Sequence, residues 1–195
     1  VGSEMCIRDR VSIVNEDQDD DEDPAEYNWY YFQSNGKAYK KGDSANTRFR
    51  TINGKRYAFD DDGKMLYGWV NSSGERESDE DGWKTAEYYL GDWNDGSMKT
   101  GWQKIKNKWY YLNPKNGAMK TGWQKINSKY YYLDLDNGAM KTGWLEINDK
   151  YYYLNSSGVM QTGWVTVKNK KYYMNSNGVM KTGWQPIGGK FYYFN

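Results

Sequence analysis

The stretch MKTGWQKIKNKWYYLNPKNGA, residues 98–118, concentrates four large aromatic side chains in one short unit, and the chain then begins again with MKTGWQKIN. The Gly-Trp pair recurs in steps of 21, 21, 20 and 20 residues, at Gly101-Trp102, Gly122-Trp123, Gly143-Trp144, Gly163-Trp164 and Gly183-Trp184. A fixed period near 20 residues indicates a solenoid or array, in which each unit buries its apolar face only against its neighbours.

A two-residue polar break divides each unit into two short strands. The breaks are Lys106-Asn107, Asn127-Ser128, Asn148-Asp149, Lys168-Asn169 and Gly188-Gly189. Asn and Gly tolerate the positive φ that a tight hairpin turn demands, so each unit is predicted to form one β-hairpin. Because an isolated two-stranded hairpin is marginally stable in water, the hairpins must stack. The sequence therefore predicts an all-β solenoid of stacked β-hairpins with a period of about 20 residues.

The turn also predicts which side chains share a face of the hairpin. With Lys106-Asn107 as the loop, Trp102 lies opposite Tyr111 and Lys104 lies opposite Trp109. Side chains alternate across a strand, so one face carries Trp102, Lys104, Trp109 and Tyr111, and the other carries Ile105, Tyr110 and Leu112. The face with the aliphatic residues is predicted to form the core.

Degenerate copies extend the array towards the N-terminus, over residues 27–97, before the regular repeats of residues 98–195. One ring-rich strand is Trp29-Tyr30-Tyr31-Phe32, and a second unit runs from Phe49 to Phe59. A third unit begins at Gly68-Trp69, carries an acidic insertion to about Gly82, and resumes at Tyr88-Tyr89-Leu90. The regular repeats stop partway through a unit at Asn195, so we expect a truncated C-terminus.

The first 26 residues differ from the rest. Residues 1–10, VGSEMCIRDR, resemble a translated sequencing adapter and are interpreted as an artefact, which makes a longer natural chain the expectation. In residues 11–26, eight of the positions from Glu16 to Glu26 are Asp or Glu, which predicts an acidic disordered linker. A calcium loop is the alternative, but the segment lacks the alternating Asp spacing and the turn glycine of an EF-hand.

The composition limits the classes of function that the chain could have. The chain has no His and only one Cys, which removes the commonest general base and any thiolate metal set, and no run of about 18 apolar residues could span a membrane. No cofactor or metal site and no catalytic constellation are expected in this fragment.

The two halves of the chain differ in charge. Residues 1–97 carry 22 acids and 12 bases, whereas residues 98–195 carry 4 acids and 15 bases. The basic half could attract a polyanion, and nucleic acid is the disfavoured candidate.

The units GWQKIKNKWYYLNPKNGAMKT and GWQKINSKYYYLDLDNGAMKT resemble the cell-wall-binding repeat, also called the choline-binding repeat, of surface proteins and wall hydrolases of Gram-positive bacteria and their phages. The resemblance covers most of residues 27–195. It implies a secreted, non-catalytic module at the cell wall that holds choline of teichoic acids in aromatic cages between hairpins, often beside an enzyme on the same chain. Similar repeats in toxins and glucan-binding enzymes imply the alternative, a carbohydrate-binding array.

Two same-face rings of one hairpin and one ring of the next would form a three-sided cage, in which cation–π attraction and a soft Met wall suit choline. The predicted choline-binding residues are Trp102, Trp109, Tyr132 and Met119 for the first cage; Trp123, Tyr130, Tyr153 and Met140 for the second; and Trp144, Tyr151, Tyr173 and Met160 for the third. The competing interpretation is that the rings only pack, which we favour for Tyr110, Tyr131 and Tyr152 on the aliphatic face.

One unit departs from this pattern, because Lys171 stands where the others have Trp109, Tyr130, Tyr151 and Phe191. An ammonium group there would repel a choline cation, so no working site is expected with Trp164, Tyr193 and Met180. The early units are doubtful too, because Arg56 and Glu87 hold this place and Ala58 replaces the later tyrosine.

Overall fold

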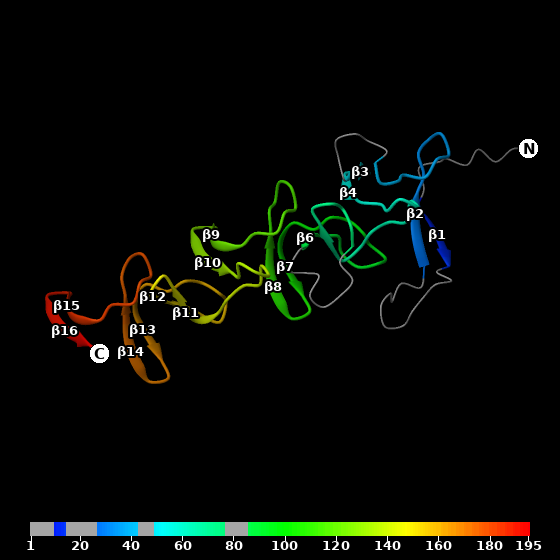
Figure 1. Ribbon diagram of the computed structural model, residues 1–195. Helices are drawn as coiled ribbons and strands as arrows, with labels where there is room; N and C mark the ends of the chain where they lie inside the picture. The colour runs from blue at the N-terminus through cyan, green and yellow to red at the C-terminus, as the bar shows by residue number, and fades with distance from the viewer. Residues whose placement is uncertain (1–9, 15–26, 43–48, 77–85) are drawn as a thin grey trace, which may run out of the picture. The chain divides into compact units, whose positions relative to one another are not determined.

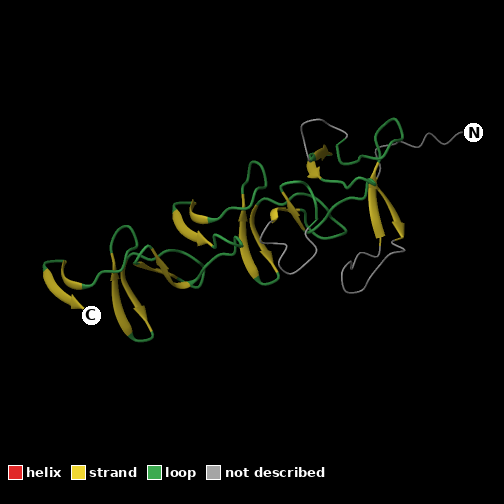
Figure 2. Ribbon diagram, viewed as in Figure 1, coloured by secondary structure: helices red, strands yellow, loops and turns green. Residues whose placement is uncertain are grey.

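The computed structural model describes residues 10–14, 27–42, 49–76 and 86–195. In these residues the backbone forms strands, turns and loops and no helix (Figures 1 and 2). The sixteen strands are β1 (Arg10–Val14), β2 (Tyr27–Tyr31), β3 (Arg50–Ile52), β4 (Lys55–Tyr57), β5 (Trp69–Asn71), β6 (Ala86–Tyr89), β7 (Gly101–Ile105), β8 (Lys108–Leu112), β9 (Gly122–Ile126), β10 (Lys129–Leu133), β11 (Gly143–Ile147), β12 (Lys150–Leu154), β13 (Gly163–Val167), β14 (Lys170–Met174), β15 (Gly183–Ile187) and β16 (Lys190–Phe194). Each odd-numbered strand pairs with the strand that follows it, in eight separate two-stranded sheets. The predicted series of hairpins is confirmed.

The turns of the regular hairpins have the predicted geometry. Both residues of each two-residue break have positive φ, for example 43° and 64° at Lys106 and Asn107 and 57° and 77° at Gly188 and Gly189. Two successive positive φ values define the type I′ turn, whose twist matches that of the two strands it joins. The same turn closes the earlier hairpin of β3 and β4 at Asn53-Gly54.

The strand register follows from the turn. In the β9–β10 hairpin, Trp123 lies opposite Tyr132 and Lys125 lies opposite Tyr130. The hairpins β11–β12, β13–β14 and β15–β16 repeat this pairing. The third degenerate unit also forms its predicted hairpin, since Trp69 pairs with Tyr89, although a register irregularity follows Val70. The insertion between its two strands falls largely on residues 77–85, outside the described residues.

One buried side chain recurs in five successive repeats, at the end of the second strand or directly after it. Leu90, Leu112, Leu133, Leu154 and Met174 occupy this place, and each is at most 1% exposed. In the regular repeats an isolated β-bridge joins this residue to a Met in the following loop: Leu112 to Met119, Leu133 to Met140, Leu154 to Met160 and Met174 to Met180. The bridge folds each loop back onto its own hairpin, and the buried residue anchors that contact.

The chain divides into two compact units, one made of residues 1–104 and 111–119 and the other of residues 105–110 and 120–195. The first unit contains two clusters of buried residues. One gathers Tyr31, Ile52, Tyr57, Phe59 and Met65, and the other gathers Ala58, Leu66, Val70 and Leu90.

The start of the chain differs from its prediction. Residues 11–26 were predicted to be a disordered linker, yet Val11–Val14 belong to β1, which pairs with β2 so that Arg10 lies opposite Tyr31 and Val14 lies opposite Tyr27. That part of the prediction is wrong, because Val11, Ile13 and Val14 are β-branched residues, which favour a strand. The acidic residues 15–26 lie outside the described part of the chain.

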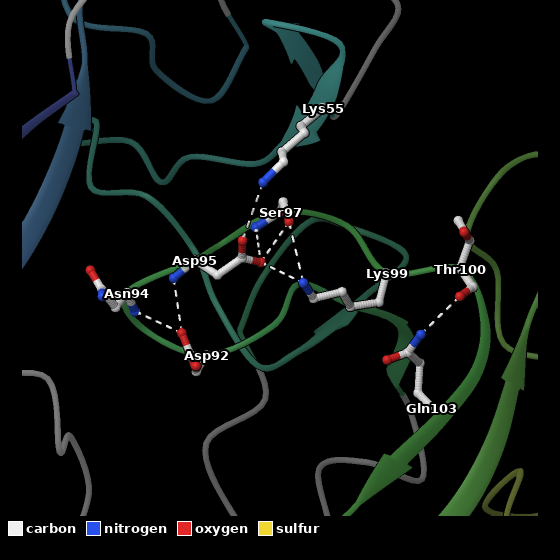
Figure 3. Close-up of polar contacts among 8 residues, drawn as sticks. All are labelled: Lys55, Asp92, Asn94, Asp95, Ser97, Lys99, Thr100 and Gln103. Atoms are coloured by element: carbon white, nitrogen blue, oxygen red, sulfur yellow. Dashed lines mark hydrogen bonds and ion pairs between the residues drawn. The ribbon is translucent and has the colours of Figure 1, made fainter.

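A carboxylate organises the loop between β6 and β7 (Figure 3). Asp95 Oδ2 accepts hydrogen bonds from the Ser97 hydroxyl (2.5 Å) and amide (3.1 Å) and lies 2.7 Å from Lys99 Nζ, while Asp95 Oδ1 lies 3.7 Å from Lys55 Nζ. Burial alone would raise the pKa of Asp95, but the hydrogen bonds from Lys99 and Ser97 outweigh burial and lower it. The ionised carboxylate therefore stabilises the loop that precedes the regular repeats.

Replacement of Asp95 with Asn is expected to lower the free energy of unfolding by about 1 kcal/mol at pH 7, because charge-assisted hydrogen bonds are lost. A carboxyl whose pKa is lower in the folded chain stabilises it above the unfolded pKa, near 4, and ceases to do so as pH falls through the folded pKa. Urea unfolding at pH 7 and pH 2 tests this, with the exposed Asp136→Asn as control. An equal loss for Asp95→Asn at both pH values would contradict the assignment.

Candidate binding site

Each hairpin pairs its Gly-Trp tryptophan with the tyrosine opposite it. The ring centroids are 5.1 Å apart for Trp102 and Tyr111, 5.3 Å for Trp123 and Tyr132, 5.2 Å for Trp144 and Tyr153, 5.3 Å for Trp164 and Tyr173, and 5.3 Å for Trp184 and Tyr193. The planes are strongly inclined, at 57° to 73°. This edge-to-face packing fixes the orientation of the tryptophan on one face of its hairpin.

The next hairpin presents a different tyrosine to that tryptophan. The ring centroids are 5.0 Å apart for Trp123 and Tyr152, 4.7 Å for Trp144 and Tyr172, and 5.0 Å for Trp164 and Tyr192. Each of these tyrosines is the middle residue of its strand and lies on the face opposite its own hairpin's tryptophan. Where two successive hairpins meet, the tryptophan-bearing face of the first hairpin therefore packs against the opposite face of the second, the face that carries its middle tyrosine.

This geometry changes the predicted grouping of the cage residues. The sequence placed Tyr153 beside Trp123 and Tyr173 beside Trp144, whereas the structure packs both tyrosines on tryptophans of their own hairpins. The prediction assumed that neighbouring hairpins meet with like faces. In a solenoid one face of each unit meets the preceding unit and the other meets the following one, so the ring predicted only to pack, Tyr152, also borders the tryptophan of the hairpin before it.

A cavity of about 280 Å³ lies where Trp123 meets the following repeats. Its lining residues are Trp123, Tyr130, Tyr152, Met160, Ser176 and Asn177. Tyr130 is 42% exposed, so one ring of the cavity is open to solvent. Three rings and a thioether from two successive repeats, with Ser176 and Asn177 from a third, thus border one small space, and the sequence did not predict Tyr152, Ser176 and Asn177 in it.

The methionine at this cavity also comes from further along the chain than predicted. The Met160 amide donates a hydrogen bond to the Tyr130 carbonyl (2.8 Å), as Met140 does to Trp109 (2.7 Å) and Met180 does to Tyr151 (2.8 Å). Met140, predicted for the Trp123 cage, instead packs where a Cβ on Gly158 would lie. Because the loop reaches back over the preceding repeat, each methionine lies beside the second ring of the hairpin before its own.

The equivalent place in the next repeat carries a negative charge. Tyr151 lies opposite Glu146, and the pKa of Tyr151 is raised, mainly by its hydrogen bond to the Glu146 carboxylate. In the preceding hairpin the corresponding residue is Lys125, whose ammonium group lies 5.4 Å from the centroid of the Tyr130 ring. Equivalent places in two neighbouring repeats therefore differ in local charge.

Each residue predicted for the first cage contacts a residue outside that predicted group. Trp102 packs on Tyr111, Tyr132 packs on Trp123 of its own hairpin, and the Met119 amide donates to the Glu87 carbonyl at 2.6 Å. Trp109, 42% exposed, accepts a hydrogen bond at its carbonyl from the Met140 amide. As at the second cage, the ring that the sequence assigned from the next repeat faces its own hairpin.

The described hairpins thus define a class of protein, a repeat array in which aromatic side chains line small pockets between neighbouring units. Models of two repeat families match the chain. The choline-binding repeat matches residues 83–121, 120–162, 141–180 and 161–195, and the putative cell wall binding repeat matches residues 27–38 and 47–65. Because the first model covers more than half of the chain, the chain belongs to the choline-binding repeat family. Repeats of this family are binding modules, which agrees with the non-catalytic prediction for this fragment.

Solved structures share the fold. CbpJ from Streptococcus pneumoniae is 34% identical with a TM-score of 0.71, over 95% of this chain and 62% of CbpJ. Choline binding protein F of the same species is 38% identical with a TM-score of 0.65, over 87% of this chain and 54% of that protein. The choline-binding domain of CbpL, also from S. pneumoniae, is 28% identical with a TM-score of 0.53, over 88% of this chain and 86% of the domain. The chain thus spans less than two thirds of the length of the first two proteins.

A comparison with curated protein sequences gives no match. Among the residues that the structure describes, no helix is long and apolar enough to cross a membrane.

Proposed function

We propose that this chain is a non-catalytic cell-wall-binding module that holds choline of teichoic acids in ring-lined pockets between hairpins. The observation that carries the proposal is the cavity of about 280 Å³ bordered by Trp123, Tyr130, Tyr152 and Met160. Choline is a permanent cation with an apolar surface, and each ring face adds about 0.5 to 2 kcal/mol of cation–π attraction. The polarizable thioether suits the methyl groups.

The size of the cavity supports a small head group as the ligand. Pockets for drug-sized ligands hold about 300 to 1,000 Å³, so this cavity lies at the lower limit. A stack of sugar units would need a longer surface than one pocket offers. Repetition compensates for a weak individual site, because choline groups repeated along one wall polymer would engage several pockets at once. The module would accordingly act at the cell surface.

Choline binding can be tested by titration of the intact chain. We expect millimolar choline to change tryptophan fluorescence and to elute the chain from a choline-type matrix, while glucose and dextran do neither. Elution by dextran or wall sugar but not by choline would contradict the proposal and favour the carbohydrate-binding alternative.

The charge difference between two neighbouring pockets gives a further prediction. Glu146→Gln is expected to weaken choline binding at the Trp144 pocket about threefold, because an exposed carboxylate beside the cation contributes less than about 1 kcal/mol. Lys125→Gln should have the opposite effect at the Trp123 pocket, where a nearby ammonium group is removed. The indole NMR signals of Trp123 and Trp144 report each pocket separately. Unchanged affinities in both variants would show that neither charge acts on the ligand.

A further inference from the structure

The Trp123 pocket contains polar groups from a repeat that lies beyond its rings. Its three rings and its thioether come from two successive repeats, whereas Ser176 and Asn177 lie in the loop after β14, in a third repeat. These two residues, which we call the polar rim, add an aliphatic hydroxyl and a carboxamide to the lining. The pocket therefore has a part made of rings and a part that can form hydrogen bonds.

Met160 determines where the loop with the polar rim lies. The Met160 amide donates a hydrogen bond to the Tyr130 carbonyl (2.8 Å), which holds Met160 beside the pocket. The Met160 side chain occupies the space that a Cβ on Gly178 would need, and the φ of Gly178 is 79°. Glycine adopts this conformation at no steric cost, and it leaves the space to the thioether. The loop is thus packed directly against a wall of the pocket.

A hydrogen-bonded turn holds the polar rim in place. The Asn175 side-chain oxygen accepts hydrogen bonds from the amides of Asn177 (3.0 Å) and Val179 (2.9 Å), and the Asn175 amide donates to the Val179 carbonyl (2.9 Å). These bonds use the backbone of Asn177 and leave its side chain free. Within the described part of the chain, neither the Ser176 hydroxyl nor the Asn177 carboxamide has a hydrogen-bond partner. Both groups are therefore available to a ligand.

A loop from the repeat after next also reaches an equivalent place earlier in the chain. Arg56 holds the place of Tyr130 in its own unit, because the Met98 amide donates to the Arg56 carbonyl (2.8 Å) as Met160 does to Tyr130. Arg56 Nη2 lies 3.5 Å from the carbonyl oxygen of Lys115, in the loop after β8, which is two units further along. The position of the polar rim beside Tyr130 thus has a counterpart at a second place in the array.

We propose that Ser176 and Asn177 determine the specificity of the Trp123 pocket by donating hydrogen bonds to the oxygen atom of the hydroxyethyl arm of choline. This assignment rests on the proposed choline function and extends it to the other end of the ligand. The trimethylammonium group has no hydrogen-bond donor or acceptor, so rings and a thioether suit it. The oxygen of the arm can accept hydrogen bonds, which a hydroxyl and a carboxamide supply.

A ligand that lacks only this oxygen tests the proposal. Ethyltrimethylammonium keeps the cation and the two-carbon arm of choline. We expect the intact chain to bind choline about fivefold more tightly, the effect of one neutral hydrogen bond, as read from the indole NMR signal of Trp123. Equal affinities would overturn the role of the polar rim and leave the choline function standing. A Trp123 signal that responds to neither ligand would overturn both, so the two failures are distinguishable.

Substitutions in two equivalent loops separate recognition from a structural role. The double variant Ser176→Ala, Asn177→Ala is expected to weaken choline about fivefold and to leave ethyltrimethylammonium unchanged, so that the preference disappears. The control, Ser156→Ala with Ser157→Ala, removes two hydroxyls at the equivalent places of the preceding repeat, outside this pocket, and should keep the preference. An equal loss for both ligands in the first variant would show that the polar rim only supports the pocket. A preference that survives there, or disappears in the control, would also overturn the proposal.

Discussion

Leu133→Ala is expected to lower the free energy of unfolding by about 3 kcal/mol. Leu133 is fully buried at the end of β10 and forms the β-bridge that folds the loop at Met140 back onto its hairpin. Truncation of a buried leucine removes its transfer free energy and leaves a cavity, which together cost about 2 to 5 kcal/mol. Because an array is stabilised by contacts between nearest neighbours, the loss should concentrate in the flanking repeats. Urea unfolding followed by circular dichroism measures it.

A second leucine two positions along the chain gives the matched control. Leu135 is 65% exposed, so Leu135→Ala removes the same atoms from the surface and should change stability by about 0.5 kcal/mol or less. If the two substitutions had similar effects, the buried residue would not be the anchor of its repeat.

Tyr152→Ala is expected to remove choline binding at the Trp123 pocket, with a loss of affinity of at least tenfold. The Tyr152 ring lies 5.0 Å from that of Trp123 and borders the cavity, so its truncation removes both a cation–π partner and a wall. Because other pockets remain, the number of choline equivalents bound per chain should fall by one. Isothermal titration, together with the Trp123 indole signal, measures both quantities.

Two variants show whether the ring of Tyr152 is responsible. Tyr152→Phe keeps the ring and should bind choline as the unaltered chain does. Tyr153→Ala truncates the residue that the sequence assigned to this pocket, and should spare the Trp123 signal while it disturbs Trp144, which Tyr153 contacts. A loss at Trp123 from Tyr153→Ala but not from Tyr152→Ala would restore the sequence-based grouping.

Local chemistry made the hairpins predictable. The turn pairs such as Asn127-Ser128 require positive φ at two successive residues, and that geometry determines which residues of the two strands lie opposite each other. The pairing of Trp123 with Tyr132 and the buried place of Leu112 follow from this register and from the alternation of side chains.

Contacts between repeats were not predictable in the same way. Periodicity shows that hairpins stack, but it contains no information about the rotation between one hairpin and the next, and that rotation decides whether Tyr152 or Tyr153 reaches Trp123. The sequence also does not show how far each loop extends over the preceding repeat, because the hydrogen bond from Met160 to Tyr130 joins residues of two different repeats. The strand at Val11–Val14 was missed because the acidic residues after it dominate the composition of the segment.

A crystal structure of the intact chain grown with choline would show directly where choline binds. We expect choline with its trimethylammonium group among the rings of Trp123, Tyr130 and Tyr152, and no choline beside Lys171. An empty Trp123 pocket at saturating choline, or choline bound beside Lys171 instead, would contradict it.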